Sequence, residues 1–185
     1  MDELTPLLRA AQGGDRLALA SFIRGSQAEV WRLCAYLVDR QAADDLTQEV
    51  YLRAWTALSG WRGEASARTW LLAIARRTCA QAIRRRWPLL LPIEPAADDH
   101  RIVADSEEVV LLNQLIAGLD PQRRAAFVLT QLLGLSYAEA AEVCGCPVGT
   151  IRSRVARARA DLASQLRDSG LAPALATAPI SDQPR

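Results

Sequence analysis

Apolar residues recur along most of this chain at intervals of three or four positions, the spacing of one face of an α-helix. The clearest series comprises Ile151, Val155, Ala158, Leu162 and Leu166, which share one stripe when successive residues are placed about 100° apart. Runs with the alternating apolar and polar pattern of β-strands are nearly absent. The pattern therefore predicts an all-α protein.

Capping residues, glycines and prolines divide this pattern into separate helices. In the first half, Thr5, Asp15 and Ser26 are predicted N-caps, and helices are expected over about 5–12, 15–23, 26–37, 40–58 and 66–86. In the second half, Ser136 and Glu139 form a predicted capping box, and helices are expected over about 106–117, 120–133, 136–144 and 147–166.

Three prolines interrupt the helical pattern in the middle of the chain. Pro88, Pro92 and Pro95 disfavour helix, and the residues after them have little periodicity. We therefore expect two small helical domains, residues 1–87 and 107–167, joined by a Pro-rich acidic linker at 88–106. Residues 168–185 are rich in Pro, Ala and Ser, which predicts a disordered tail.

Charge is strongly segregated although the net charge is only +1. Residues 62–86 hold seven arginines and one acid, Glu64, whereas residues 94–108 hold six acids and one arginine, Arg101. Residues 145–159 add four arginines and no acid. Two basic surfaces separated by an acidic segment indicate two contacts with a polyanion.

The second basic segment follows a short capped helix and the turn Gly145-Cys146-Pro147. This order of a short helix, a tight turn and a basic helix is typical of a helix-turn-helix motif, expected here at about 137–157. The basic helix would carry its apolar stripe behind and Gly149, Ser153 and Arg157 in front, which suits a DNA major groove. The alternative is an arginine-rich face that is merely solvated.

Two helices of the first half also carry unusual outward faces. Leu52 lies in the middle of the polar face expected for the helix at 40–58, as either an isolated exposed leucine or part of a docking surface. Trp70 is interleaved with Arg77 and Arg84 in the helix at 66–86. An aromatic plate between cations suits single-stranded nucleic acid, although packing of Trp70 against a neighbouring helix is the simpler interpretation.

Other functional classes find little support in the composition. His100 is the single histidine, and there is no Gly-rich phosphate loop and no Ser/His/Asp or Cys/His cluster, so we do not expect an enzyme or a cofactor. The four cysteines, Cys34, Cys79, Cys144 and Cys146, are expected to be small buried residues and not metal ligands. No apolar run approaches the ~20 residues of a membrane span, and the acidic N-terminus does not resemble a signal peptide, so a cytoplasmic protein is expected.

Four stretches resemble bacterial RNA polymerase sigma factors of the extracytoplasmic-function (ECF) type, within the sigma-70 family. They are DDLTQEVYLRAW at 44–55, WRGE at 61–64 followed by TWL at 69–71 and IAR at 74–76, LSYAEAA at 135–141, and PVGTIRSR at 147–154. The resemblance covers roughly residues 15–86 and 107–166. All four stretches occur in the family's order on either side of a proline-broken linker.

The resemblance implies a protein that binds RNA polymerase core and directs transcription from specific promoters. Its first domain would dock on the polymerase clamp through the motif at 45–58 and read the melted −10 promoter element through residues 61–86. Its second domain would read the −35 element as duplex DNA. An anti-sigma factor is a further candidate partner. Many relatives carry Asn at the position of Arg77 and an acid at that of Gln81, which puts the −10 base preference in doubt.

The resemblance also assigns individual residues to the three surfaces. The polymerase-binding residues would be Asp45, Gln48, Glu49, Leu52 and Arg53. The −10 contacts would come from Trp61, Arg62, Trp70, Arg77, Gln81 and Arg84. The −35 contacts would come from Thr150, Arg152, Ser153, Arg154 and Arg157.

A stand-alone transcription regulator with a helix-turn-helix domain is the alternative. Such a protein needs a ligand pocket or a dimer interface within residues 1–86 and would bind a palindromic site without polymerase. The basic helix at 66–86 argues against it, because a sensor domain does not need a second cationic surface.

Overall fold

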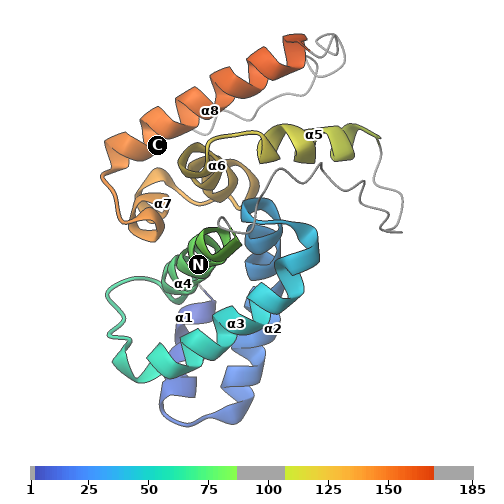
Figure 1. Ribbon diagram of the computed structural model, residues 1–185. Helices are drawn as coiled ribbons and strands as arrows, with labels where there is room; N and C mark the ends of the chain where they lie inside the picture. Colours follow the sequence, from blue (N-terminus) through green and yellow to red (C-terminus); the bar gives the residue numbers. More distant parts are fainter. Residues whose placement is uncertain (1–2, 87–106, 169–185) are drawn as a thin grey trace.

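The computed structural model describes residues 3–86 and 107–168, which fold into helices joined by short loops (Figure 1). The first unit contains α1 (Leu4–Gln12), α2 (Arg16–Leu37), α3 (Arg40–Ala57), a 3₁₀ turn (Leu58–Gly60) and α4 (Ala67–Arg86). The second contains α5 (Glu107–Ala117), α6 (Pro121–Phe127), a π-helical turn (Val128–Leu132), α7 (Tyr137–Cys144) and α8 (Val148–Asp168). These ranges contain no strand, so the predicted all-α fold is confirmed. The predicted linker at 88–106 and nearly all of the predicted tail lie outside the described residues.

Helix α2 is one continuous helix, whereas the sequence pattern predicted two. Ser26, the expected N-cap of a separate helix, is buried in the middle of α2 and donates a 2.7 Å hydrogen bond to the carbonyl oxygen of Phe22. Its hydroxyl also lies 2.7 Å from that of Tyr51 on α3. The prediction was wrong because this serine bonds to the preceding turn and to a neighbouring helix instead of capping a new one.

The start of α1 also differs from the prediction. Helix α1 begins at Leu4, and Thr5 lies inside it, so Thr5 is not its N-cap. The hydroxyl oxygen of Thr5 instead accepts a 2.8 Å hydrogen bond from the backbone N–H of Ala67, at the start of α4. The other capping predictions are confirmed for Asp15 on α2 and for the Ser136–Glu139 capping box on α7.

Helix α8 buries the stripe that its sequence predicts. Ile151, Val155, Ala158 and Leu162 are all buried, the first three almost completely. Leu115 at the end of α5 and the following Leu119 pack against Ala158 and Leu162. The turn before α8 contains Gly145 with a φ of +64°, a left-handed conformation that glycine adopts without strain. The predicted helix-turn-helix order is therefore present.

The two units pack against each other. Helix α4 contacts α7, and α2 contacts both α5 and α6 (Figure 1). At this interface Arg68 of α4 forms an ion pair with Glu29 of α2 and donates a 2.6 Å hydrogen bond to the carbonyl oxygen of Leu133. Arg124 reaches the carbonyl oxygen of Leu37 at 3.4 Å. A single hydrophobic cluster continues across the boundary, so the units do not have fully separate cores.

Arg68→Ala is expected to lower the free energy of unfolding by about 2 kcal/mol, because it removes charge-assisted hydrogen bonds from a largely buried carboxylate. The Glu29 side chain is only 15% exposed, so water replaces the lost contact poorly. Urea unfolding followed by tryptophan fluorescence measures the change. Arg62→Ala is the control, since its ion pair with Glu64 is 79% and 74% exposed. An equal loss in the two variants would show that the Arg68 contact adds nothing.

Candidate nucleic-acid and protein interfaces

Helix α3 presents a polar face that contains one large apolar side chain. Asp45, Gln48 and Leu52 are exposed on this face, and the Leu52 side chain is 70% exposed. Trp55, one turn further on, is 58% exposed. Helices α2 and α4 pack against α3. The buried arc of α3 and the following turn comprises Leu46, Val50, Ala54 and Leu58, and Trp55 lies outside it.

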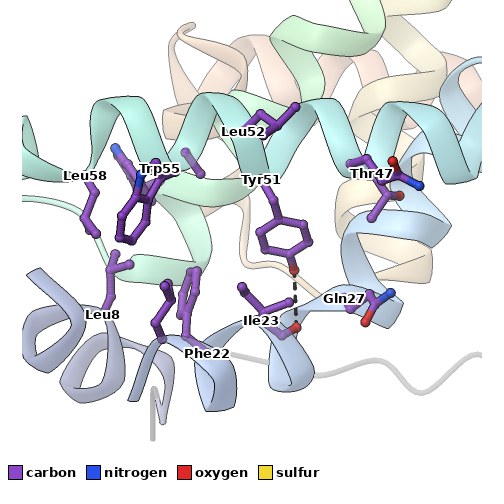
Figure 2. Close-up of a pocket in the computed structure, with 13 residues that line it drawn as sticks. Leu8, Phe22, Ile23, Gln27, Thr47, Tyr51, Leu52, Trp55 and Leu58 are labelled. Atoms are coloured by element: carbon purple, nitrogen blue, oxygen red, sulfur yellow. Dashed lines mark hydrogen bonds between the residues drawn. The ribbon is translucent and has the colours of Figure 1, made fainter. Parts of the chain in front are cut away.

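Leu52 and Trp55 form one rim of a groove between α1, α2 and α3 (Figure 2). The groove has a volume of about 510 Å³, and its wall is almost entirely apolar. Phe22 and Ile23 of α2 form the opposite side, and the Tyr51 hydroxyl points across it to the carbonyl oxygen of Ile23 at 3.4 Å (Figure 2). Exposed apolar side chains at the rim of such a groove are typical of a protein-binding surface.

Two of the predicted docking residues are bonded to α4. Arg53 forms an ion pair with Glu49 and also donates a 2.5 Å hydrogen bond to the side-chain oxygen of Gln81. Arg85 adds a longer contact to Glu49, at 3.9 Å. The polar face of α3 and the predicted −10 face of α4 are therefore joined by a hydrogen-bond network. Glu49 and Arg53 are half-buried and less free than Asp45, Gln48 and Leu52.

The structure places Trp61, a predicted DNA contact, inside the protein. Its side chain is 6% exposed, and its ring centroid lies 6.3 Å from that of the half-buried Trp70. The guanidinium of Arg9 stands 6.0 Å from the centroid of the Trp61 ring. In this conformation the Trp61 ring offers no free face to a base, so we assign it to the support of its loop. Arg62, the next residue, is exposed at the surface, where it forms a 3.0 Å ion pair with Glu64.

The seven arginines counted at 62–86 do not form one surface. Arg68 is used at the interface with the second unit, and Arg76 interacts with Cys144 of α7. Arg77, Arg84 and Arg85 are exposed on α4. Sequence periodicity cannot separate these two sets, because the interface with α7 depends on how the two units pack.

The outward face of α8 carries the predicted DNA-reading side chains. Arg152, Ser153 and Arg157 are exposed, and the Ser153 hydroxyl donates a 3.0 Å hydrogen bond to the carbonyl oxygen of Thr150. Arg154 is held against α6 by Gln122 and reaches the sulfur of Cys146 at 3.5 Å. Arg154 therefore lies on the flank of the face formed by Arg152, Ser153 and Arg157, and Thr150 is half-buried at its start.

Three of the four cysteines are core residues as expected, whereas Cys146 is only half-buried, so the prediction was wrong for it. Cys34, Cys79 and Cys144 are buried, and Cys79 donates a 3.6 Å sulfur hydrogen bond to Cys34. This hydrogen bond and burial raise the pKa of Cys79, and burial raises the pKa of Cys144. Within residues 3–86 and 107–168, no three His, Cys, Asp or Glu side chains gather as metal ligands. Over the same residues, no helix has the length and apolar character of a membrane span.

Two sigma-70 family models match the chain. Sigma-70 region 2 matches residues 22–88, which include α3 and α4, and sigma-70 region 4 matches residues 110–162, which include the helix-turn-helix. Both matches fall on the helices that carry the surfaces described above.

Curated relatives and solved structures are similar over most of the chain. The ECF RNA polymerase sigma factor SigC of Mycobacterium tuberculosis is 50% identical over 85% of this chain and 88% of its own length. The ECF RNA polymerase sigma-E factor of Escherichia coli K12 is 30% identical over 83% of this chain and 88% of its own length. The structure of CnrH in complex with the cytosolic domain of CnrY superposes with a TM-score of 0.70 at 25% identity, covering 89% of this chain and 97% of that one. Because both sigma-70 regions are matched in order and relatives are similar almost throughout, the chain belongs to the ECF sigma factors of the sigma-70 family, which direct transcription initiation at promoters.

Proposed function

We propose that this sigma factor binds RNA polymerase core through α3 and contacts its promoters at two separate places, without any bond chemistry of its own. The polymerase-binding residues are Asp45, Gln48, Glu49, Leu52 and Arg53. The melted −10 strand is contacted by Arg62, Trp70, Arg77, Gln81 and Arg84, and the −35 duplex by Thr150, Arg152, Ser153, Arg154 and Arg157. Because RNA polymerase core and promoter DNA are found in the bacterial cytoplasm, the protein acts there.

The exposed face of α8 is the observation that carries the proposal. Arg152, Ser153 and Arg157 project from a helix whose opposite stripe is buried, so the helix is held in place and this face is exposed. Arginine recognises guanine by paired hydrogen bonds in the major groove, and each such pair contributes about 1–3 kcal/mol of discrimination. Thr150, near the start of the helix, lies where backbone N–H groups favour a phosphate.

The α4 face supports contact with a separated strand and not with a duplex. Trp70 is half-buried and offers at most part of its ring, while Arg77 and Arg84 provide exposed positive charge on the same helix. Aromatic stacking and cations along the backbone are the usual means of holding single-stranded DNA. Unstacking a base costs a few kcal/mol, so this contact needs the polymerase to help open the promoter.

A protein inhibitor is the further partner that we infer. CnrH, which is similar over 89% of this chain, forms a complex with the cytosolic domain of CnrY. The apolar groove beside Leu52 and Trp55 has room for a few apolar side chains from one face of an amphipathic helix. An inhibitor that occupied this groove would compete directly with polymerase core.

In vitro transcription with purified core and start-site mapping tests the proposed function. Core supplemented with this protein is expected to initiate at defined positions, whereas core alone is not. A gel shift of the protein without polymerase is expected to show weak binding. Nanomolar binding to a palindromic site without polymerase would contradict the proposal and indicate a stand-alone regulator.

Arg84→Ala is expected to weaken transcription from all promoters to a similar degree, because an exposed arginine near a strand contributes charge and no base reading. The logarithm of promoter affinity is expected to depend on salt with a slope reduced by about 0.7–0.9, the effect of one phosphate contact. Holoenzyme binding measured across a salt series gives this slope. A change in base preference with an unaltered slope would assign Arg84 a different role.

A further inference from the structure

The segment 58–67 joins α3 to α4 and carries Trp61 and Arg62, and it is held in place by α1. The side-chain nitrogen of Gln12, at the end of α1, donates hydrogen bonds to the carbonyl oxygens of Leu58 and Trp61, both at 2.9 Å. Leu58 is the first residue of the 3₁₀ turn Leu58–Gly60, and Trp61 directly follows this turn. One amide group therefore fixes both ends of the turn by which the chain leaves α3.

The other end of the segment is also bonded to α1. Backbone N–H groups in the first turn of a helix have no partner within that helix. The N–H of Ala67, the first residue of α4, donates to the hydroxyl oxygen of Thr5 at 2.8 Å. Ser66 accepts a 3.1 Å hydrogen bond from the N–H of Thr69 and so caps the same turn. The start of α4 is thus fixed by two hydrogen bonds, one to Ser66 directly before the helix and one to Thr5 of α1.

The centre of the segment rests on Arg9. The guanidinium of Arg9 lies 6.0 Å from the centroid of the Trp61 ring. A Cβ atom at Gly63 would lie 2.9 Å from a terminal nitrogen of Arg9, and the φ angle of Gly63 is +76°. Glycine at this position thus allows the close approach of Arg9 to the backbone as well as the left-handed turn.

Thr5, Arg9 and Gln12 follow one another at i, i+4 and i+7, so they form a single stripe along α1. The adjacent stripe carries Leu8 and Ala11, which are buried in the core. A polar stripe on a surface helix ordinarily faces water. Here all three side chains contact residues of one segment, at its start, centre and end. Helix α1 precedes the region 2 match, which begins at residue 22.

We propose that Thr5, Arg9 and Gln12 are positioning residues for recognition of the melted −10 strand. They hold segment 58–67 so that Arg62 and the first turn of α4 meet the strand in one defined arrangement. A segment that is already ordered loses less conformational entropy when DNA binds, and contacts of fixed geometry discriminate better between bases. The proposal rests on the proposed function, since it assigns α1 a role in reading the −10 element.

Transcription of a promoter library tests this role. Holoenzyme containing the full-length protein transcribes templates with randomised −10 and −35 segments, and the transcripts and their templates are sequenced. Gln12→Ala and Thr5→Val are each expected to reduce base selectivity at −10 about five- to tenfold, as expected for the loss of one or two hydrogen bonds. The −35 preference and the affinity for core are expected to stay as in the wild type. Thr5→Ser keeps the hydroxyl and is expected to restore the wild-type −10 profile.

Arg9→Ala is compared with Arg16→Ala, which removes the same charge from an exposed position at the start of α2. Only the Arg9 change is expected to affect the −10 profile. An unchanged −10 profile in Gln12→Ala and Thr5→Val would overturn the proposal. So would equal losses at −10 and −35 accompanied by a lower melting temperature, since α1 would then contribute stability alone. If the wild-type protein itself fails to direct transcription by core, both this proposal and the proposed function are wrong.

Discussion

Replacing Leu52 by aspartate is expected to lower the affinity for RNA polymerase core about a hundredfold. The leucine side chain is 70% exposed at the rim of the apolar groove, so a partner that covers it gains most of its apolar surface. Complete burial of a leucine contributes about 1.5–3 kcal/mol, and a carboxylate in its place would lose this term and be buried without a partner. Titration of labelled protein with core measures the change.

The fold itself is expected to tolerate this substitution, because an exposed side chain contributes little to stability. Leu17→Asp is the matched control: Leu17 is 81% exposed on α2 and does not line the groove. Its affinity for core is expected to equal that of the wild type. Similar losses in the two variants would mean that added negative charge, and not the groove, determines binding, and the α3 assignment would then fail.

Arg152→Ala is expected to abolish the preference for one base pair in the −35 element while leaving the other positions nearly unchanged. A paired arginine–guanine contact contributes about 1–3 kcal/mol, so the discrimination at that position is expected to fall by a factor of about 5 to 150. Arg152 is exposed on the outward face of α8, whereas Ile151 and Val155 are buried. The substitution therefore leaves the packing of α8 against the core unchanged. Sequencing of transcripts from promoters randomised at −35 reveals the affected position.

Arg159→Ala provides the comparison for Arg152, since it removes the same charge from the same helix. Arg159 is bonded to Gln131 at 2.7 Å and lies two turns from the start of the reading face. Its loss is expected to weaken all −35 sequences slightly and equally. If Arg152→Ala retained every base preference of the wild type, the reading role would pass to Ser153 and Arg157.

Local sequence patterns were reliable wherever the deciding contacts lie within one helix or one turn. The apolar stripe of α8 follows from residue spacing alone, because it results from the helical repeat. The Ser136–Glu139 capping box and the turn at Gly145-Cys146-Pro147 were predicted for the same reason: the bonds that define them span only a few residues. Leu52 was singled out because an apolar side chain interrupts a polar face.

Predictions that depended on a distant partner were less successful. Ser26 and Thr5 are residue types that commonly act as N-caps. The tertiary fold instead brings Tyr51 within hydrogen-bonding distance of Ser26, and Ala67 within that distance of Thr5. Trp61 has an aromatic ring on which a base could stack, but in the fold this ring packs against Arg9 and Trp70. No local pattern contains these contacts, which join residues far apart in the chain.

The sequence by itself determined the helical class, the position of the helix-turn-helix and the residues that face outward on α8, because each depends on periodicity and short-range hydrogen bonds. Only the tertiary structure decided which arginines of 62–86 are exposed. Arg68 and Arg76 are used at the contact between the two units, whereas Arg77 and Arg84 remain exposed. The physical reason is that a charge becomes a binding surface or a structural link according to the element packed against it, and that packing is a property of the whole fold.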